Sequence, residues 1–350
     1  MKHLIAFFCM ITMMNSLDAQ TPTPPVAKKV SKIDTLHGGI RVDNYYWLKL
    51  KSNPEVASYL EAENRYHESV MKPTVNLQET IYNEILKRTK QTDLSVPYKL
   101  GDYWYYTRTV EGQQYPIYCR KKGSLESEEQ IVLELNELAK GHKFLGLGLY
   151  QVTDDGNLLA YSLDTTGFRQ YQLGFKDLRT GQVLPDSIGQ VNSAAWAKDN
   201  KTLFYVKEDQ AKRPYRLYRH VLGQDQKEDE ILYEEKDELY RIWTYRTSDR
   251  KYILLMTASS ITNEARYLPS DKSRDPFKMF LAREVGHEYS LDHREGQFYI
   301  LSNKDAKNFR LLTAPDENTE PKNWEEFLPH RRKVKIESMT LFKDFGVFIE

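Results

Sequence analysis

The chain of 350 residues has little cysteine, no excess of charge of either sign and no long apolar run. Its only cysteines are Cys9 and Cys119, which is too few for a framework of disulfide bonds. Lys+Arg and Asp+Glu both number 50, so neither nucleic acid nor an anionic membrane surface is expected as a partner. No stretch is long enough to span a bilayer. With 40% hydrophobic and 12% aromatic residues, the chain can nevertheless bury a sizeable core.

The sequence also lacks the short motifs of several enzyme classes. It has no Gly-x-Ser-x-Gly nucleophile elbow, Gly-rich phosphate loop, His-Glu-x-x-His or Cys-x-x-Cys. We therefore assign no catalytic residue and no cofactor. His287 and His293 lie six residues apart across an expected hairpin, close to acidic residues, which raises the question of a metal site. Strand-end side chains that face solvent are the ordinary explanation, and we predict no metal ligand.

Residues 1–19 have the pattern of a secretory signal peptide. Lys2 opens a short basic start, residues 4–14 are mostly apolar, and small residues precede Gln20 as in a cleavage site. A buried N-terminal strand is the alternative. The signal peptide predicts a secreted or periplasmic protein. Cleavage would leave Cys119 as the one cysteine, which we expect to be a buried and unreactive strand residue.

The segment 20–92 is predicted to be extended and then helical. Its start is rich in Pro and Thr, as in an extended leader. Asn53 is a good N-cap, Pro54 suits the first helical position, and Pro73 stops the helix. A second helix is predicted over residues 76–90. Because two short amphipathic helices cannot form a core alone, we expect them to pack either on the β-domain that follows or on a domain outside this chain.

From residue 93 to 350 the pattern is that of repeated β-hairpins. Residues 98–122 alternate aromatic and β-branched runs with glycine turns, and both faces of this hairpin carry large side chains. Comparable turns recur every 44 to 55 residues, at Gly101, Gly156, Asn200, Arg250, Gly296 and Phe345. Several strands per repeat at this period are typical of a β-propeller. A series of separate β-sandwiches is the alternative.

The repeats predict a mainly β fold with about five complete blades. Residues 336–350 open a sixth blade and end within an expected strand. Because a propeller closes its ring to remove unpaired strand edges, we expect the chain to be truncated relative to the fold that it encodes. Three side chains are candidates for the lining of a central substrate channel: Arg169, Tyr171 and Arg266. Pairing of the two arginines with loop carboxylates is the alternative.

Several stretches resemble the prolyl oligopeptidase family of serine peptidases, and within that family the oligopeptidase B (protease II) group. The similarity extends from about residue 26 to 350. Asn44 is a departure, since the family often has Pro there, but it alters only a turn. The stretches are Asp-Asn-Tyr-Tyr-Trp-Leu at 43–48, Asn-Pro-Glu-Val-Ala-Ser-Tyr-Leu at 53–60, Asp-Tyr-Trp-Tyr-Tyr-Thr-Arg at 102–108, Gly-Gln-Gln-Tyr-Pro-Ile-Tyr-Cys-Arg at 112–120, Tyr-Ser-Leu-Asp-His at 289–293 and Asn-Lys-Asp-Ala-Lys-Asn-Phe-Arg-Leu at 303–311.

The resemblance implies a seven-bladed propeller that caps a C-terminal α/β-hydrolase domain and admits only short peptides. That domain would carry the catalytic Ser, Asp and His and the acidic residues that select Arg or Lys before the scissile bond. All of these would lie beyond Glu350, so none is assigned here. The N-terminal helices would dock on the hydrolase domain.

On this resemblance we expect the gating part of a secreted serine-type oligopeptidase, which would be inactive alone. A non-catalytic propeller that serves as a binding module, or a decayed fragment, is the alternative. A further possibility is a separate chain that supplies the missing blades and hydrolase domain.

Overall fold

The computed structural model describes residues 22–350, and the predicted signal peptide over 1–19 lies outside them. The chain divides into two compact units, one that ends at Gln91 and one that runs from Thr92 to Glu350. We describe each unit by itself. No helix in the described residues is both long and apolar enough to cross a membrane.

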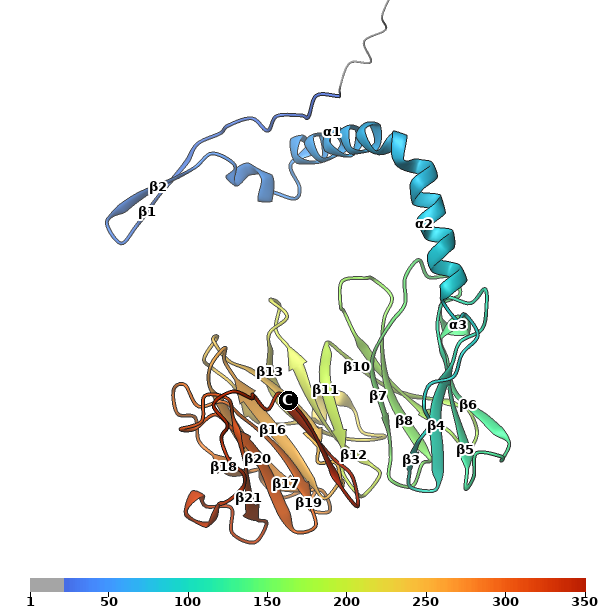
Figure 1. The fold of residues 1–350 in the computed structure, drawn as a ribbon, viewed down its shortest axis with the longest axis vertical. Helices are drawn as coiled ribbons and strands as arrows, with labels where there is room; N and C mark the ends of the chain where they lie inside the picture. The colour runs from blue at the N-terminus through green and yellow to red at the C-terminus, as the bar shows by residue number, and fades with distance from the viewer. Residues whose placement is uncertain (1–21) are drawn as a thin grey trace, which may run out of the picture. The chain divides into compact units, whose positions relative to one another are not determined.

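The N-terminal unit contains a β-hairpin and two successive α-helices (Figure 1). The hairpin was not predicted. It turns at His37 and Gly38, which both have positive φ, and it pairs Ile33 with Val42. The elements of this unit are β1 (Lys32–Leu36), β2 (Gly39–Asp43), the 3-10 helix η1 (Tyr46–Lys49), α1 (Pro54–Met71), the 3-10 helix η2 (Lys72–Thr74) and α2 (Val75–Arg88).

Helix α1 begins where the sequence predicts. The side chain of Asn53 accepts a hydrogen bond of 3.0 Å from the backbone N–H of Glu55, and Pro54 occupies the first turn, where no intrahelical donor is needed. Pro73 lies in η2, between the helices. Helix α2 begins at Val75, close to the predicted start.

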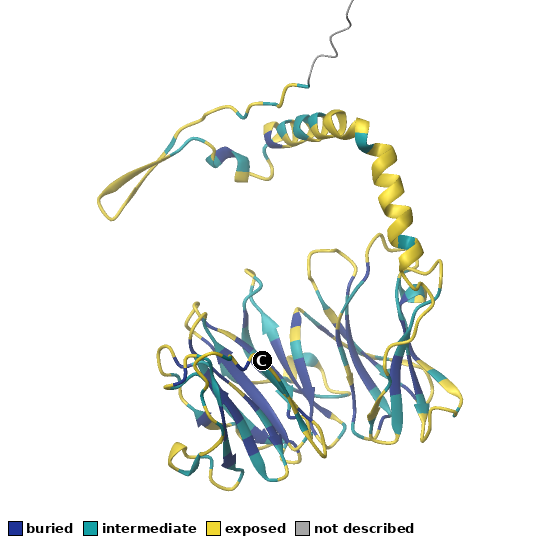
Figure 2. Cartoon of the chain, viewed as in Figure 1, coloured by how far each residue is buried: buried dark blue, intermediate teal, exposed yellow. Residues whose placement is uncertain are grey.

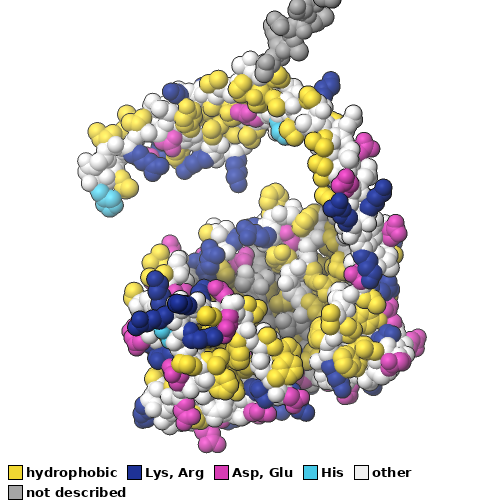
Figure 3. Space-filling view, viewed as in Figure 1, with side chains coloured by type: hydrophobic (Ala, Val, Ile, Leu, Met, Phe, Trp, Pro, Cys, Tyr) yellow, Lys and Arg dark blue, Asp and Glu magenta, His cyan; other side chains and the backbone are white. Residues whose placement is uncertain are grey.

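The apolar faces of these helices are open within the described residues. No residue of α2 is buried, and Leu77, Ile81 and Ile85 are 59%, 48% and 58% exposed. Figures 2 and 3 show exposed residues along α2 and hydrophobic side chains on the surface of both helices. Val56 at the start of α1 is buried. Trp47 of η1 is also buried, edge-on to Tyr59 of α1, and its indole N–H donates to the Lys28 carbonyl.

The unit from Thr92 to Glu350 is a β-propeller, as the sequence predicts. Its described residues form five antiparallel four-stranded sheets, here blades 1 to 5, and one two-stranded sheet. Each blade is a meander in which consecutive strands pair. The first strands of blades 2, 3 and 4 are in contact, with β11 beside both β7 and β15.

The bounds of the strands follow the predicted repeats. Blade 1 is β3 (Tyr98–Leu100), β4 (Tyr103–Arg108), β5 (Ile117–Lys122) and β6 (Glu129–Glu134). Blade 2 is β7 (Gly146–Val152), β8 (Leu158–Asp164), β9 (Gln172–Asp177) and β10 (Val183–Gly189). Blade 3 is β11 (Val191–Trp196), β12 (Thr202–Glu208), β13 (Pro214–Val221) and β14 (Glu230–Glu234).

Blade 4 is β15 (Arg241–Arg246), β16 (Tyr252–Ala258), β17 (Asn263–Pro269) and β18 (Lys278–Leu281). Blade 5 is β19 (Tyr289–Arg294), β20 (Gln297–Ser302), β21 (Arg310–Pro315) and β22 (Glu325–Leu328). The two-stranded sheet is β23 (Ser338–Leu341) and β24 (Gly346–Ile349). The short helices are α3 (Leu135–Leu138), η3 (Gln226–Glu228) and η4 (Pro321–Asn323).

The turns between the first and second strands of the blades define one side of the propeller, which we call the turn face. Five of the turn residues predicted from the sequence have positive φ, where the chain reverses: Gly101 (58°), Gly156 (72°), Asn200 (56°), Arg250 (61°) and Gly296 (78°). In three turns an aspartate fixes this reversal. Asp155, Asp199 and Asp249 each accept a backbone N–H from two residues further on.

The core lies between the blades. One apolar cluster joins blades 2 and 3 around Phe175 and Trp196, and another joins blades 4 and 5 around Tyr252 and Phe298. Tyr105 and Tyr106 point to opposite faces of β4, and both are buried (2% and 8% exposed). The prediction that this hairpin is covered on both faces is therefore confirmed (Figure 2).

Candidate functional site at the turn face

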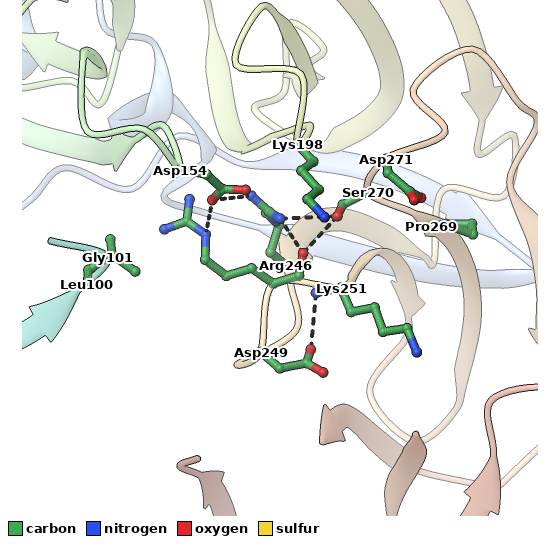
Figure 4. Close-up of a pocket in the computed structure, with 11 residues that line it drawn as sticks. Leu100, Gly101, Asp154, Lys198, Arg246, Asp249, Lys251, Pro269, Ser270 and Asp271 are labelled. Carbon is green, nitrogen blue, oxygen red and sulfur yellow. Dashed lines mark hydrogen bonds and ion pairs between the residues drawn. The ribbon is translucent and has the colours of Figure 1, made fainter. Parts of the chain in front are cut away.

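A cavity of about 580 Å³ opens at the turn face of the propeller. Residues from four blades line it, with the larger share from blade 4 (Figure 4). The lining is mostly charged and polar. Its residues are Leu100 and Gly101 of blade 1, Asp154 of blade 2, Lys198 of blade 3, and Arg246, Asp249, Arg250, Lys251, Pro269, Ser270 and Asp271 of blade 4.

Asp154 is the centre of the polar contacts in this cavity. Its Oδ1 lies 2.9 Å from Arg246 Nη1 and 2.6 Å from Arg250 Nε. Its backbone N–H donates to the side chain of Asn200 in the neighbouring turn, over 2.8 Å. One residue of blade 2 thus holds the turns of blades 3 and 4. The two ion pairs link blade 2 to blade 4, although blade 3 lies between these blades in the sequence.

The two arginines are fixed by further contacts within the cavity wall. Arg250 Nη2 donates to the Val152 carbonyl over 2.9 Å, and Arg246 Nη2 donates to Ser270 Oγ over 3.1 Å and to the Arg250 carbonyl. Ser270 Oγ in turn donates to the same carbonyl over 2.8 Å. The guanidinium groups are therefore preorganised, because backbone carbonyls hold them together with the side chains of Asp154 and Ser270.

Arg246 is the most deeply placed cation of the site. Its side chain is 8% exposed, and its Nε is buried without a hydrogen-bond partner. Burial lowers the pKa of this guanidinium, the nearby Arg250 adds to that effect, and Asp154 opposes it. Arginine stays charged in proteins, so the arrangement concentrates positive charge at the base of the cavity.

A second cavity of about 440 Å³ lies next to the first and shares Asp249 with it. His293 forms part of its wall, and its Nδ1 lies 2.6 Å from Asp249 Oδ2. Its Nε2 lies 3.4 Å from Asp316 Oδ2, and the two atoms are not aligned as a hydrogen bond. His293 therefore connects the turn of blade 4 to blade 5.

The expectation that His287 and His293 face solvent is wrong. The side chains of His287 and His293 are 5% and 0% exposed. Each imidazole has a polar partner inside the fold, which compensates for the loss of contact with water. His287 Nε2 lies 2.8 Å from Ser302 Oγ, and burial lowers the pKa of this imidazole. The two rings have different partners at opposite ends of β19. In residues 22–350 no group of three or more His, Cys, Asp and Glu side chains could hold a metal ion.

Arg169 and Tyr171 both lie in the connection between β8 and β9 of blade 2. Arg169 is exposed and has positive φ (55°), and its backbone N–H donates to Asp164 Oδ2 over 2.7 Å. Tyr171 is half-buried. Its ring covers Gly148 so closely that a Cβ there would come within 2.5 Å of it. The connection is on the side opposite the turn face, because β8 runs away from its turn at Gly156.

Arg266 belongs to a different group, on β17 of blade 4. Its Nη1 lies 2.5 Å from Glu264 Oε1, and its guanidinium lies 4.3 Å from the centre of the Tyr233 ring. Arg283 completes the group, because it bridges Glu264 and Glu235 over 3.2 Å and 2.6 Å. Arg266 thus pairs with a carboxylate, which was the alternative left open. A channel role for Arg169, Tyr171 and Arg266 stays a prediction, and the structure shows no contact among the three.

The charged stretch from Lys227 to Glu238 contributes to this group, because it contains Glu235. It contains the outer strand β14, and Glu235, which follows that strand, is 4% exposed. No local pattern in the sequence indicates the pairing of Glu235 with Arg283, because the two residues are 48 positions apart.

Comparison with known proteins decides the family. Residues 24–350 match the family model described as the prolyl oligopeptidase N-terminal β-propeller domain. The chain belongs to the prolyl oligopeptidase family. It is 37% identical to dipeptidyl aminopeptidase BI of Pseudoxanthomonas mexicana over 99% of this chain and 51% of that protein. It is 34% identical to protease 2 of Moraxella lacunata, over 89% of this chain and 48% of that protein.

Oligopeptidase B from Leishmania major has a similar structure. The TM-score is 0.85 at 28% identity, over 94% of this chain and 49% of that one. The chain therefore spans about half the length of the relatives that it matches. It is the propeller part of a prolyl oligopeptidase family protein, together with a helical N-terminal segment.

Sequence reasoning missed most of the turn-face site in this family member. Arg250 was singled out only as a turn residue, and Asp154, Lys198 and Arg246 were not singled out at all. Asp154 and Arg246 are 92 residues apart, so no local spacing links them. One pattern in the sequence could have indicated the site, namely the charged residues in the predicted turns. Asp154, Lys198 and Arg250 each lie within two residues of a predicted turn residue.

Proposed function

We propose that this chain is the N-terminal and propeller part of a secreted serine-type oligopeptidase that cleaves short peptides after Arg or Lys. The observation that carries the proposal is the match of five four-stranded blades and the flanking segment to oligopeptidase B from Leishmania major, at a TM-score of 0.85. The resemblance of the sequence to oligopeptidase B supports the preference for basic residues. The chain by itself is expected to hydrolyse nothing.

In the proposed enzyme, the chemistry belongs to an α/β-hydrolase domain outside these 350 residues. There a serine would attack the peptide carbonyl, a histidine would act as base and then as acid, and backbone donors would hold the oxyanion. This chain would supply the ring of blades through which short peptides enter. Leu77, Ile81 and Ile85 of α2 would supply part of the surface on which the hydrolase domain docks, since they form an open apolar stripe.

A second candidate is release of dipeptides from free N-termini. The observation in its favour is the 37% identity to a protein named dipeptidyl aminopeptidase BI, which exceeds the identity to protease 2. The two candidates differ in one measurable respect. An endopeptidase accepts a substrate whose N-terminus is blocked, whereas a dipeptidyl aminopeptidase requires a free α-amino group at a fixed distance from the scissile bond.

The test begins with the coding sequence downstream of codon 350. We expect the reading frame to continue into a hydrolase domain with a Gly-x-Ser-x-Gly motif. The whole protein is then assayed with an arginyl amide in two forms, one with a blocked N-terminus and one that carries a free dipeptide. Cleavage of both supports the endopeptidase, and cleavage of the free form alone supports the dipeptidyl aminopeptidase. A stop codon after Glu350, or hydrolysis by the purified 350-residue chain, would overturn the proposal.

Secretion is tested separately, by fractionating cells and sequencing the N-terminus of the mature protein. We expect exported protein that begins at Gln20. Intact Met1 in cytoplasmic protein would contradict the signal peptide without affecting the proposed chemistry.

A further inference from the structure

We propose that a basic turn after blade 5 binds an acidic peptide segment, with Arg332 and Lys333 as its principal ligands. The basic turn comprises residues 330–335, His-Arg-Arg-Lys-Val-Lys, in the connection between β22 and β23. Binding of this kind is independent of the proposed peptidase function, because it needs this chain alone. Three features of the turn support it: a fixed backbone, exposed cations without partners, and an excess of positive charge in the surroundings.

The backbone of the basic turn is held from two sides. Arg331 and Val334 form an isolated antiparallel bridge, which closes the turn on itself. Asn308, in the connection between β20 and β21, donates from Nδ2 to the carbonyls of Arg331 and Arg332 over 2.9 Å and 2.8 Å. The Asn308 carbonyl accepts the backbone N–H of Ile336 over 3.1 Å, and Ile336 is buried. The turn is therefore ordered before a ligand binds, which lowers the entropic cost of binding.

The side chains at the tip of the basic turn are free to meet a ligand. Arg332 and Lys333 are exposed, and neither has a hydrogen-bond or ion-pair partner among residues 22–350. The other two Lys and Arg side chains of the turn are paired with the carboxylates of Glu337 and Glu350. The two cations at the tip can therefore be reached from solvent without breaking an existing ion pair.

Positive charge is in excess around the basic turn once the ion pairs are set aside. In the adjoining connection between β20 and β21, Lys304 is paired with Glu284, whereas the exposed Lys307 and Asp305 have no partner in the described part of the chain. With the two cations at the tip, this leaves three cations against one carboxylate. The excess persists when the α-carboxylate of Glu350 is also counted. Figure 3 shows Lys and Arg side chains gathered where the red C-terminal part of the ribbon lies in Figure 1.

An acidic peptide segment fits this surface better than an extended anionic surface does. The free cations belong to neighbouring residues of one tight turn, so they match a few carboxylates at the spacing of side chains along a peptide. Arginine binds a carboxylate through two parallel hydrogen bonds, and lysine adds a point charge. An anionic membrane is attracted by a wide basic face, whereas this chain has no net charge outside such local clusters to offer one.

The test is a titration of the purified 350-residue chain, extended at its C-terminus by a few neutral residues so that the terminal carboxylate lies away from the turn. The probe is the peptide Glu-Ala-Glu-Ala-Glu, blocked at both ends and labelled with a neutral fluorophore, and binding is measured by fluorescence anisotropy. Its uncharged counterpart is Gln-Ala-Gln-Ala-Gln. We expect the Glu peptide to bind about tenfold more tightly than the Gln peptide, roughly the effect of two exposed ion pairs.

Salt should remove most of this difference. Raising the salt concentration from about 0.1 M to about 1 M shortens the Debye length from about 10 Å to about 3 Å, so contacts between exposed charges are screened. Equal binding of the two peptides at low salt, or a difference that salt does not reduce, would overturn the proposal.

Vesicles separate the peptide from a membrane surface. They contain equal parts of phosphatidylcholine and phosphatidylglycerol, and the chain is sedimented with them at low salt. We expect the chain to stay in the supernatant. Sedimentation with the vesicles that is lost in Arg332→Gln with Lys333→Gln would assign the turn to anionic lipid and overturn the proposal.

Variants locate the site. The double variant Arg332→Gln with Lys333→Gln should weaken binding of the Glu peptide by about fivefold to tenfold. Both side chains lack partners in the described residues, so the midpoint of unfolding should not change. The matched control is Lys272→Gln with Arg274→Gln, an exposed pair of the same two residue types in the connection between β17 and β18. An equal loss of affinity in the two double variants would show that overall charge, and not the basic turn, attracts the peptide.

Discussion

Asp154 and Arg250 form an ion pair of 2.6 Å between the first turns of blades 2 and 4, with the whole of blade 3 between them in the sequence. Arg246 reaches the same carboxylate over 2.9 Å. Neighbouring blades share an apolar core, but these two blades are linked at the turn face by charge. Asp154 therefore links three turns at once, because its backbone N–H also donates to the side chain of Asn200 in the turn of blade 3.

Asp154→Asn should lower the stability of the chain. The asparagine keeps the size of the side chain and leaves two arginines, one of them nearly buried, without a counter-charge. Hydrogen bonds to charged groups contribute about 1.5–3 kcal/mol, so we expect a loss in that range in urea unfolding at pH 7. Asp271→Asn is the control, since Asp271 lines the same cavity but is exposed. Equal stability of the two variants would show that the bridge contributes nothing.

The group around Arg283 should make stability depend on pH. Burial alone would raise the pKa of Glu235 and Glu264, but the hydrogen bonds and charge of Arg283, with Arg266 beside Glu264, hold both pKa values below the ordinary range. A carboxyl with a lowered folded-state pKa stabilises the fold above its unfolded value of about 4.3. That contribution is lost as the pH falls through the folded-state pKa. The unfolding free energy should therefore fall as the pH drops below about 5.

Arg283→Met tests the origin of this acid sensitivity. It leaves two nearly buried carboxylates without their shared partner, and we expect a loss of about 3–5 kcal/mol at pH 7. The decrease of stability towards acid pH should become smaller, because the carboxyls no longer lose an ion pair when they are protonated. Arg274→Met, at an exposed position, should change neither quantity. If the unfolding free energy of Arg283→Met decreased towards acid pH as steeply as that of the unmodified chain, the acid sensitivity would come from other carboxyls.

Local signals in the sequence predicted much of the fold, whereas the contacts between blades could not be predicted. Asn53 and Pro54 act within one helical turn, and Gly156 acts within one hairpin, so their effects can be inferred from neighbouring residues. The β1–β2 hairpin was missed because its pattern is short and its apolar residues are exposed. The role of Asp154 depends on its contact with Arg246, which is 92 residues away, and the role of Glu235 depends on its contact with Arg283, which is 48 residues away. Such pairs form only when the blades pack side by side, and the distance between two residues along the sequence does not indicate which blades these will be.

Two glycines with similar backbones should respond differently to alanine. Gly156 and Gly181 both have positive φ (72° and 79°), so alanine is strained at either position by about 1–2 kcal/mol. At Gly181 a Cβ would meet nothing within 4 Å, but at Gly156 it would lie 2.8 Å from the Tyr103 ring. We expect Gly156→Ala to cost a further 1–3 kcal/mol, roughly, in chemical unfolding. Combining it with Tyr103→Ala should remove the extra cost, and equal costs at the two glycines would contradict the close contact.

Cys119 should be almost unreactive in the native protein. Its side chain is 0% exposed on β5, and burial, aided by the charge of Glu129, raises the pKa of the thiol to about 11. Since the thiolate is the reactive form, the pKa alone should slow labelling by an aromatic disulfide reagent at pH 8 by about 100-fold relative to the unfolded chain. The measurement uses a Cys9→Ser background, so that Cys119 is the only thiol. Labelling in native buffer as fast as in concentrated urea would mean that blade 1 opens readily, because β5 is paired on both sides and only local unfolding exposes its sulfur.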